Sequence, residues 1–140
     1  MFRLMMILGY KYNALRTVLS RLLRVIYSFQ FSYNETGNNV EFCYKGLGCV
    51  IHPRAVFGSN VIVAQNTTIG GRSKKNKLPK IGDNVYIGAG TMILGDVNVG
   101  NNVVIGAGSL VINDVPDNCV VVGSPAKVIK TGITSYKDYY

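Results

Sequence analysis

Large apolar residues recur every six positions along most of this chain, with one interval of twelve. They are Ile51, Phe57, Val63, Ile69, Ile81, Ile87, Ile93, Val99, Ile105 and Val111. Smaller or β-branched residues follow four positions behind them, at Ala55, Val61, Thr67, Val85, Thr91, Val97, Val103, Ser109 and Val115. A helix repeats its apolar positions every three or four residues and a half-buried strand every two, so a period of six fits neither. It fits short extended segments joined by bends, each with one large and one small inward side chain.

Glycine, asparagine and aspartate follow the large apolar residues at several of the bends. The clearest cases are Gly58-Ser59-Asn60, Gly82-Asp83-Asn84 and Gly100-Asn101-Asn102. These residue types tolerate the positive φ angles that tight bends need. Three extended segments would close one triangular coil, and stacked coils would pair their strands with the coils above and below. The pattern predicts an all-β parallel β-helix from about residue 45 to about residue 118.

The first 33 residues follow a different pattern. Leu15, Leu19, Leu22 and Ile26 are spaced as on one face of a helix, which predicts a short amphipathic helix. This segment carries basic residues and no acidic residue. A basic amphipathic helix can lie on an anionic membrane surface, but the open end of a β-helix also needs a cap. A cap or a contact with a partner subunit is the preferred interpretation, and a peripheral membrane contact is the alternative.

The interval between Ile69 and Ile81 interrupts the repeat. Its midpoint, where an inward residue is expected, is Lys75, and the neighbouring basic residues are Arg72, Lys74, Lys77 and Lys80. Burying these charges in a thin apolar core would cost too much free energy. Residues 71–80 are therefore predicted to project from the coil as a loop. The loop is interpreted as a basic wall beside a ligand site, because loops on a rigid scaffold often carry sites; a merely solvated loop is the alternative.

Length and charge fit one domain with an N-terminal cap. The 140 residues divide into a cap segment at 1–44, a β-helix at 45–130 and a tail at 131–140. The net charge of +8 is concentrated in the cap segment and in the projecting loop. A small ligand that carries phosphate fits the loop at least as well as a nucleic acid does, because the interleaved aromatic residues of single-strand binders are missing. No nucleic acid partner is expected.

The three cysteines show no spacing typical of a metal site. Their number is odd, so they cannot all pair in disulfides within one chain: Cys43, Cys49 and Cys119. Cys49 falls in the series of small inward residues, where we expect a buried thiol. Free thiols fit a reducing cytoplasm. No signal peptide is evident, and no apolar stretch reaches the roughly 18 residues that a spanning helix needs. A cytoplasmic location is expected.

Several short segments follow one another in a fixed order between residues 46 and 130. They are Thr68-Ile69-Gly70-Gly71, Pro79-Lys80-Ile81-Gly82, Ile87-Gly88-Ala89-Gly90, Ile93-Leu94-Gly95, Ile105-Gly106-Ala107-Gly108-Ser109, Asp114-Val115-Pro116 and Val122-Gly123-Ser124-Pro125-Ala126-Lys127. This series resembles the hexapeptide-repeat acyltransferases, and within them the serine acetyltransferase-like branch. The resemblance implies a left-handed parallel β-helix, a homotrimer, acetyl-CoA as the acetyl donor, and three active sites between neighbouring subunits.

Two positions depart from that family's pattern. In serine acetyltransferases the catalytic histidine lies four hexads before the inward residue that corresponds to Ile69, and this chain has Lys45 there. A second active-site histidine of the family corresponds to Leu78. The one histidine of the chain is His52, one hexad beyond Lys45 and directly after the inward Ile51.

Acyl transfer to an alcohol needs a group that takes the hydroxyl proton, and imidazole is best suited to this at neutral pH. His52 is therefore the candidate catalytic base, with a structural or surface histidine before Pro53 as the alternative. A base also needs a group that orients it. The acids available are Glu41, Asp83 and Asp96, and a backbone carbonyl would also serve.

Further site residues are expected from position and from the resemblance. Lys45, Gln65 and Asn66 are candidates for contacts with the acceptor or the oxyanion, the last two because they lie one coil above the neighbourhood of His52. The resemblance implies that CoA runs along a groove between coils. Its candidate contacts are Gly71, Arg72, Gly88, Ala89, Gly106, Ala107, Lys127 and Lys130. Bend geometry alone would also explain the glycines.

Three classes of function fit this pattern. The leading one is an acetyl-CoA-dependent O-acetyltransferase that acts on a sugar hydroxyl of a surface polysaccharide precursor, or on a small hydroxyl compound such as serine. The second is a catalytically impaired β-helix that binds a ligand or acts as a scaffold, which Lys45 and Leu78 motivate. The third is the carbonic anhydrase version of the fold, which needs three histidine ligands for its metal. With one histidine in the chain, no metal is expected.

Overall fold

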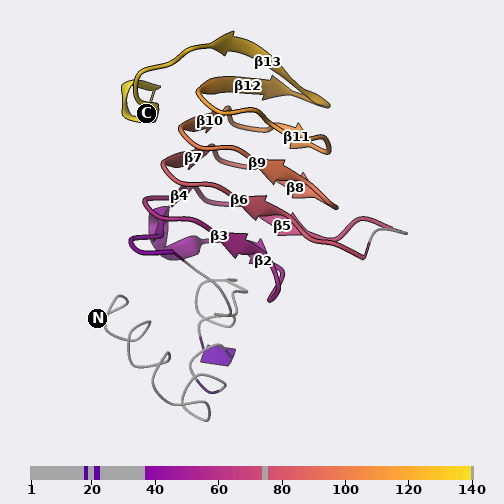
Figure 1. Ribbon diagram of the computed structural model, residues 1–140. Helices are drawn as coiled ribbons and strands as arrows, with labels where there is room; N and C mark the ends of the chain where they lie inside the picture. Colours follow the sequence, from indigo (N-terminus) through magenta and orange to yellow (C-terminus); the bar gives the residue numbers. More distant parts are fainter. Residues whose placement is uncertain (1–17, 19–20, 23–36, 74–75, 140) are drawn as a thin grey trace.

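The computed structural model describes residue 18, residues 21–22, residues 37–73 and residues 76–139 (Figure 1). Of the predicted N-terminal helix, only Val18, Arg21 and Leu22 are described, and these residues are helical and exposed. The rest of that helix, with its expected contacts to a cap, a subunit or a membrane, lies outside the described residues. Within the described ranges, no helix is long and apolar enough to cross a membrane.

Short strands wind around one axis and form a left-handed parallel β-helix, which confirms the predicted fold class (Figure 1). The strands are β1 (Glu41–Phe42), β2 (Val50–Ile51), β3 (Val56–Phe57), β4 (Ile62–Val63), β5 (Thr68–Gly70), β6 (Lys80–Ile81), β7 (Val85–Ile87), β8 (Met92–Leu94), β9 (Asn98–Val99), β10 (Val103–Ile105), β11 (Leu110–Val111), β12 (Cys119–Gly123) and β13 (Ala126–Thr131). Two 3-10 segments are η1 (Cys43–Gly46) and η2 (Tyr136–Tyr139).

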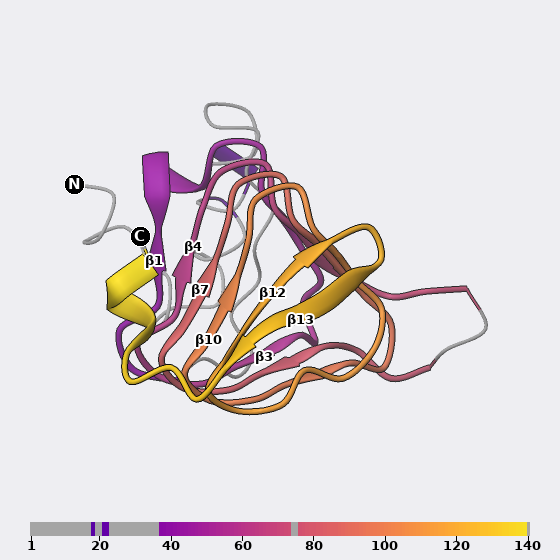
Figure 2. The ribbon, with the colours of Figure 1, turned by 90° about the horizontal axis from the view of Figure 1, so that it is seen from above.

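Three sheets form the sides of a triangle when the molecule is seen along its axis (Figure 2). Sheet 1 has the order β1-β4-β7-β10-β12-β13, sheet 2 the order β11-β8-β5-β2, and sheet 3 the order β3-β6-β9. Three corners join them. Corner 1 follows sheet 1 (43–49, 64–67, 88–91, 106–109). Corner 2 follows sheet 2 (52–55, 71–73 with 76–79, 95–97, 112–114). Corner 3 follows sheet 3 (58–61, 82–84, 100–102, 116–118).

Both six-residue series line the interior, as predicted. Every large residue from Ile51 to Val111 is at most 3% exposed, and every residue of the smaller series is at most 6% exposed. Cys49 is fully buried, which confirms the expected buried thiol. The interior hydroxyl groups bond to backbone carbonyls: Thr67 Oγ1 donates to Ala64 O at 2.8 Å and Ser109 Oγ to Gly106 O at 2.6 Å. Polar residues of the small series are thereby accommodated in an apolar core.

Corner 3 is built from hydrogen bonds that connect one coil to the next. Asp83 Oδ1 accepts the Ser59 N–H at 2.6 Å, and Asn101 Oδ1 accepts the Asp83 N–H at 2.8 Å. An asparagine with positive φ follows in successive coils, at Asn60 (56°), Asn84 (56°), Asn102 (53°) and Asn118 (55°). Asparagine adopts this left-handed conformation at low cost, so the bends are encoded locally.

Parallel pairing begins before residue 45, inside the segment that the sequence assigned to a cap, because β1 pairs with β4. Farther along the chain, the described residues 71–73 and 76–79 carry no strand and project from corner 2 (Figure 2). Ile51 pairs with Ile69, whereas Ile69 pairs with Ile93. The second turn is therefore longer than the first by the inserted loop.

The C-terminal strap, residues 132–139, folds back on the outer face of sheet 1 (Figure 2). Ile133 and Tyr136 are each 5% exposed and pack with Val104 and Val120. The Asn102 side chain holds this strap in two ways: its Oδ1 accepts the Tyr136 N–H at 2.8 Å, and its Nδ2 donates to Ile133 O at 2.9 Å. The same asparagine thus forms a bend of the coil and anchors the strap.

We expect Asn102→Ala to lower the free energy of unfolding by about 3–4 kcal/mol, because two strap hydrogen bonds are lost at about 1 kcal/mol each and a left-handed alanine costs about 1–2 kcal/mol. Urea denaturation measures this change. Asn60→Ala is the matched control, since Asn60 has a similar φ, 56° against 53°, and a similar side-chain bond to the next asparagine but no bond to the strap. Equal losses in the two variants would show that the strap contacts add nothing.

Candidate functional site

The predicted site residues divide between two corners of the coil. Corner 1 holds Lys45, Gln65 and Asn66. Corner 2 holds His52 and, where the loop leaves β5, Gly71 and Arg72. The expected position of Gln65 and Asn66 above His52 differs from the structure. The Asn66 N–H donates to Leu47 O at 2.8 Å, whereas the His52 N–H donates to Ile69 O at 2.8 Å. The structure does not bring His52 and Asn66 to one corner.

One coil spans 18 residues between Ile51 and Ile69, so the residue above His52 is Gly70 and not Gln65 or Asn66. The position of Lys45 differs for another reason, a turn that breaks the six-residue count. The large core residue before Ile51 is Phe42, which pairs with Val63. The residues between Phe42 and Val50 form an enlarged corner 1, so Lys45 is exposed and does not occupy an inward position. Counting hexads backward from Ile69 therefore does not give the position of Lys45 in space.

Tyr44 and Lys45 lie in the left-handed region, with φ of 49° and 59°. Among the non-glycine residues with positive φ in the described ranges, these two alone are not asparagine. Each costs roughly 1–2 kcal/mol of backbone free energy. Gly48, with φ of 67°, completes the turn and lies so close to the Asn66 side chain that a Cβ there would overlap Asn66 Oδ1. Lys45 and Asn66 thus belong to one connected corner. The sequence carries no local signal for a left-handed Tyr-Lys pair.

Coil stacking explains the glycines of corner 1 that were candidates for CoA contacts. A Cβ on Gly88 would lie 2.5 Å from Ala107 N and 2.8 Å from Ile105 O. A Cβ on Gly106 would lie 2.5 Å from Val122 Cγ1. Ala89 and Ala107 accompany these glycines at the same corner. The spacing of the coils therefore requires glycine at position 88, with or without a ligand, whereas at position 106 the Val122 side chain occupies the place of a Cβ.

The two candidate lysines of β13 have different surroundings. Lys127 pairs with Val122, the residue that packs over Gly106, so Lys127 lies near corner 1. The Lys130 ammonium lies 5.1 Å from the centroid of the Tyr139 ring, in a cation–π contact with η2. Lys127 is thus the better placed of the two for a ligand at corner 1.

His52 is half-buried at the end of β2. Its Nδ1 accepts a hydrogen bond from the Arg54 N–H at 3.1 Å, so the group that orients the ring is a backbone amide. Of the acids proposed for this role, Asp83 lies at corner 3 and binds Ser59, and Asp96 pairs with Lys77. With its Nδ1 lone pair occupied, the neutral ring carries its proton on Nε2. Taking a proton at Nε2 requires the other tautomer and loss of the Arg54 bond, which costs only about 1 kcal/mol.

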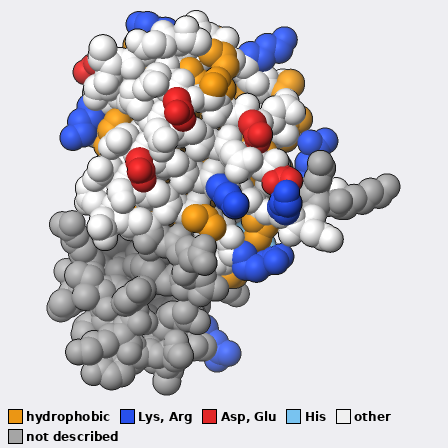
Figure 3. Space-filling model, viewed as in Figure 1, with side chains coloured by type: hydrophobic (Ala, Val, Ile, Leu, Met, Phe, Trp, Pro, Cys, Tyr) orange, Lys and Arg blue, Asp and Glu red, His pale blue; other side chains and the backbone are white. Residues whose placement is uncertain are grey.

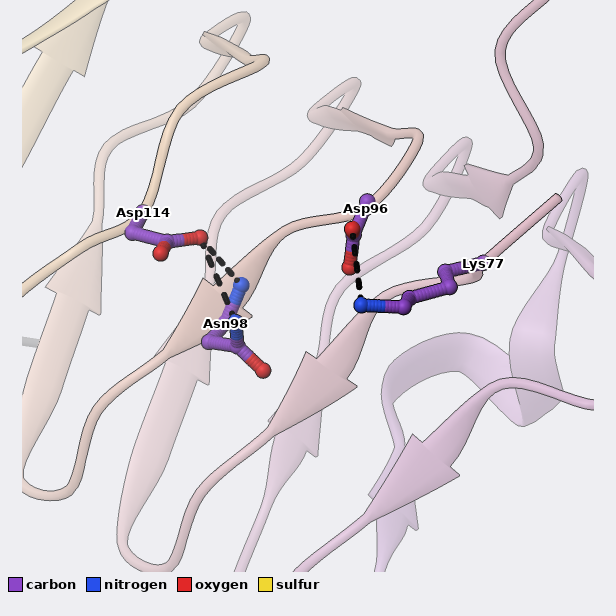
Figure 4. A network of polar contacts seen from close by, with 4 residues as sticks. All are labelled: Lys77, Asp96, Asn98 and Asp114. Carbon is purple, nitrogen blue, oxygen red and sulfur yellow. Dashed lines mark hydrogen bonds and ion pairs between the residues drawn. The ribbon is translucent and has the colours of Figure 1, made fainter. Parts of the chain in front are cut away.

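The loop rests on corner 2 of the following coil. A Cβ built on Gly95, with φ of 94°, would lie 3.0 Å from Arg72 Cβ, so Gly95 makes room for the loop. Lys77 Nζ lies 3.5 Å from Asp96 Oδ2, next to the Asp114 carboxylate that accepts the Asn98 N–H at 2.8 Å (Figure 4). The Lys77 side chain is 78% exposed, so this ion pair contributes at most about 1 kcal/mol.

Basic side chains gather toward the base of this loop on the face that Figure 3 shows. Arg54, Arg72 and Lys80 are exposed at or beside corner 2. Asp96 and Asp114 are the acids of this corner, and both have hydrogen-bond or ion-pair partners. The corner is therefore suited to an anionic ligand such as a phosphate ester.

Burial raises the pKa of all three cysteines. The Glu41 charge adds to the effect at Cys43, and the Asp117 charge adds to it at Cys119. A raised pKa leaves the thiols protonated at neutral pH, which makes them poor nucleophiles. Within the described ranges, no group of three or more His, Cys, Asp or Glu residues could hold a metal ion.

The chain is similar to known serine acetyltransferases in sequence and in structure. The family model described as "Bacterial transferase hexapeptide (six repeats)" matches residues 79–113. A probable serine acetyltransferase 2 of Oryza sativa subsp. japonica is 50% identical over 95 residues, which cover 66% of this chain and 25% of that protein. The serine acetyltransferase of Synechococcus elongatus is 38% identical over 114 residues, which cover 80% of this chain and 47% of that protein.

Solved structures give the same result. The crystal structure of Neisseria gonorrhoeae serine acetyltransferase in complex with serine matches with a TM-score of 0.72 and 35% identity, over 81% of this chain and 47% of that chain. The chain thus spans less than half the length of each of these three relatives.

Proposed function

Because the chain belongs to the hexapeptide-repeat acyltransferases, in their serine acetyltransferase-like branch, we propose that it transfers an acetyl group from acetyl-CoA to the hydroxyl of a small molecule such as serine. The observation that carries the proposal is the match of its coils, over 81% of the chain, to a serine acetyltransferase that binds serine. A sugar hydroxyl is the second acceptor class to be tested.

The proposed reaction uses His52 as the group that moves the proton. The acceptor oxygen attacks the thioester carbonyl carbon, and His52 Nε2 takes the hydroxyl proton once the ring carries its other proton on Nδ1. The C–S bond then breaks, and the same proton passes to the leaving sulfur. The products are an O-acetyl ester and the thiol of CoA. Release of the Arg54 N–H bond is a small cost beside the several kcal/mol that a positioned base contributes.

Binding of the two substrates is assigned to different corners. Arg72 and the neighbouring cations of corner 2 would meet the phosphates of CoA, with Gly71 at the base of the loop. Lys45, Gln65 and Asn66 would contact the acceptor from corner 1. Since these corners are separate within one chain, a complete site needs corner 1 of one subunit beside corner 2 of another. This need supports a homotrimer with sites between neighbouring subunits.

One outer face of the coil is suited to that assembly. Val50 and Met92, at outward positions of β2 and β8 in sheet 2, are 45% and 41% exposed. The outer face of sheet 1 is already covered by the C-terminal strap. The outer face of sheet 3 carries Lys80 and Asn98, which are exposed and polar. Burying exposed apolar surface favours association, so sheet 2 is the face we assign to the subunit contact.

Met92→Lys is therefore expected to convert the homotrimer to monomers, because it places a charge in the centre of the apolar face. Size-exclusion chromatography with light scattering measures the molar mass. Val56→Lys is the matched control, since Val56 takes the corresponding outward position on β3 of sheet 3. A trimeric Met92→Lys protein, or a monomeric wild type, would contradict the assignment.

The proposed activity is tested by thiol release from acetyl-CoA in the presence of serine or a panel of sugars, with mass spectrometry of the product. Release that depends on a hydroxyl acceptor, with an acetyl ester as product, is the expected result. Calorimetric binding of acetyl-CoA without transfer to any acceptor would refute the enzyme proposal. It would favour a binding protein, which Lys45 and Leu78 at the two family positions would then explain.

A further inference from the structure

Gly70 and Gly71 are the two glycines of the described residues that the fold itself does not explain. The others either have positive φ or stand where a Cβ would meet atoms of a neighbouring coil at under 3 Å. Gly70 has neither property: a Cβ there would meet nothing within 4 Å. A Cβ on Gly71 would make only an ordinary contact, at 3.6 Å from Leu78 Cδ2. The coil would accept a side chain at either position.

Gly70 lies on the outer face of sheet 2, beside His52. The two residues follow the paired residues Ile51 and Ile69, and the His52 N–H donates to Ile69 O at 2.8 Å. On the other side Gly70 pairs with Leu94 of β8. The column of outward positions therefore runs from His52 through Gly70 to Leu94, with a side chain on each side and none at Gly70. This leaves an opening over the β5 backbone, which we call the Gly70 opening.

We propose that the Gly70 opening receives the acyl-thioester end of acetyl-CoA, so that the reacting carbonyl lies against the β5 backbone beside the His52 imidazole. The inference rests on the proposed acetyltransferase function and adds a place for the donor. A glycine permits close approach of a ligand to the backbone. Reacting groups must come within about 3–3.5 Å of one another, which a side chain at this position would prevent.

The surroundings of the opening fit the thin, uncharged end of the donor. Leu94 and the glycine backbone line the opening, and both are uncharged. Arg72, which packs over Gly95, stands at its outer edge, where the phosphates of the same molecule would follow. A small zwitterionic acceptor has no comparable division into an apolar end and an anionic end.

Gly70→Ala and Gly70→Val test this assignment. Both variants are expected to fold with a Tm equal to or above that of the wild type, because the new side chain meets open space and the unfolded chain loses freedom. The Kd for acetyl-CoA should rise about tenfold or more in Gly70→Val and less in Gly70→Ala, in proportion to the blocked volume. The KM for the acceptor should change little. Thr68→Val, two residues earlier on the same face of β5, is the control and should bind acetyl-CoA as the wild type does.

Three results would overturn the inference. Wild-type affinity for acetyl-CoA in Gly70→Val would show that nothing enters the opening. Loss of the oligomer in that variant, measured by light scattering, would show that a second copy of the chain fills it. Failure of the wild type to bind acetyl-CoA would remove the ligand altogether. If the wild type binds acetyl-CoA but transfers to no acceptor, the proposed function fails, and the binding comparison still decides whether the opening holds the thioester.

Discussion

His52→Ala is expected to lower kcat for acetyl transfer by about 10²–10⁴-fold, the contribution of a positioned acid–base group. Stability should change little, because the side chain is half-buried at the end of β2 and lies outside the core. A thiol-release assay with acetyl-CoA and the best acceptor gives kcat, and urea denaturation confirms that the variant is folded. Lys137→Ala, an exposed position on η2, is the control for substitution as such. Wild-type kcat in His52→Ala would remove His52 from the mechanism.

A second variant separates two roles for the same ring. In the observed arrangement Nδ1 accepts the Arg54 N–H, and Nε2 is a donor. Glutamine offers an amide N–H of similar reach but takes no proton at neutral pH. His52→Gln should therefore be as inactive as His52→Ala if the ring accepts the hydroxyl proton. Substantial activity in His52→Gln would instead assign His52 to hydrogen-bond donation, for example to the oxyanion, and another group would have to take the proton.

The interior of this protein could be predicted from sequence because its order is local and repeated. Ile87 and Thr91 face inward because they occupy the large and the small inward positions of the six-residue repeat. Ile105 and Ser109 occupy the same two positions one coil later. The bends of corner 3 were also predictable, because asparagine and glycine signal positive φ. No comparable residue type marks the Tyr44–Lys45 turn, where two residues that seldom adopt positive φ do so in succession.

The packing of the C-terminal strap could not be predicted from the sequence. Tyr136 and Ile133 are buried by Val104 and Val120 and anchored by Asn102, which lies about thirty residues earlier in the chain. No periodicity in residues 131–140 indicates this packing. The sequence accordingly identified a tail but not its position on sheet 1. That position bears on the proposed assembly, because it covers part of sheet 1 and leaves Val50 and Met92 exposed on the outer face of sheet 2.

The candidate site was predicted less well than the fold. A site depends on which side chains lie close together in space, and the six-residue repeat does not determine this. The chemistry-bearing types were identifiable: one imidazole, a basic loop and a set of glycines. Their grouping was not, since the enlarged turn before Val50 places Lys45 at an exposed position of the corner that also holds Asn66, whereas His52 lies at another corner. The tautomer set by the Arg54 N–H and the free space at Gly70 likewise exist only in three dimensions.

Gly88→Ala is expected to be more damaging than Gly70→Ala, and its damage should be to the fold. The added Cβ would lie 2.5 Å from Ala107 N and 2.8 Å from Ile105 O, which are backbone atoms of the next coil. These atoms cannot move without disturbing the ladder between β7 and β10. Overpacking of this kind costs about 1–3 kcal/mol, and more where the backbone must shift.

Urea denaturation of Gly88→Ala beside Gly70→Ala makes the comparison direct, because the same methyl group is added to two glycines of the β-helix that differ in the space around them. The free energy of unfolding should fall in Gly88→Ala and should stay level or rise in Gly70→Ala. Acetyl-CoA affinity should show the reverse order, with the folded fraction of Gly88→Ala binding nearly as the wild type does. Wild-type stability in Gly88→Ala together with weakened acetyl-CoA binding would assign Gly88 to the ligand, and coil stacking would then not be the reason for this glycine.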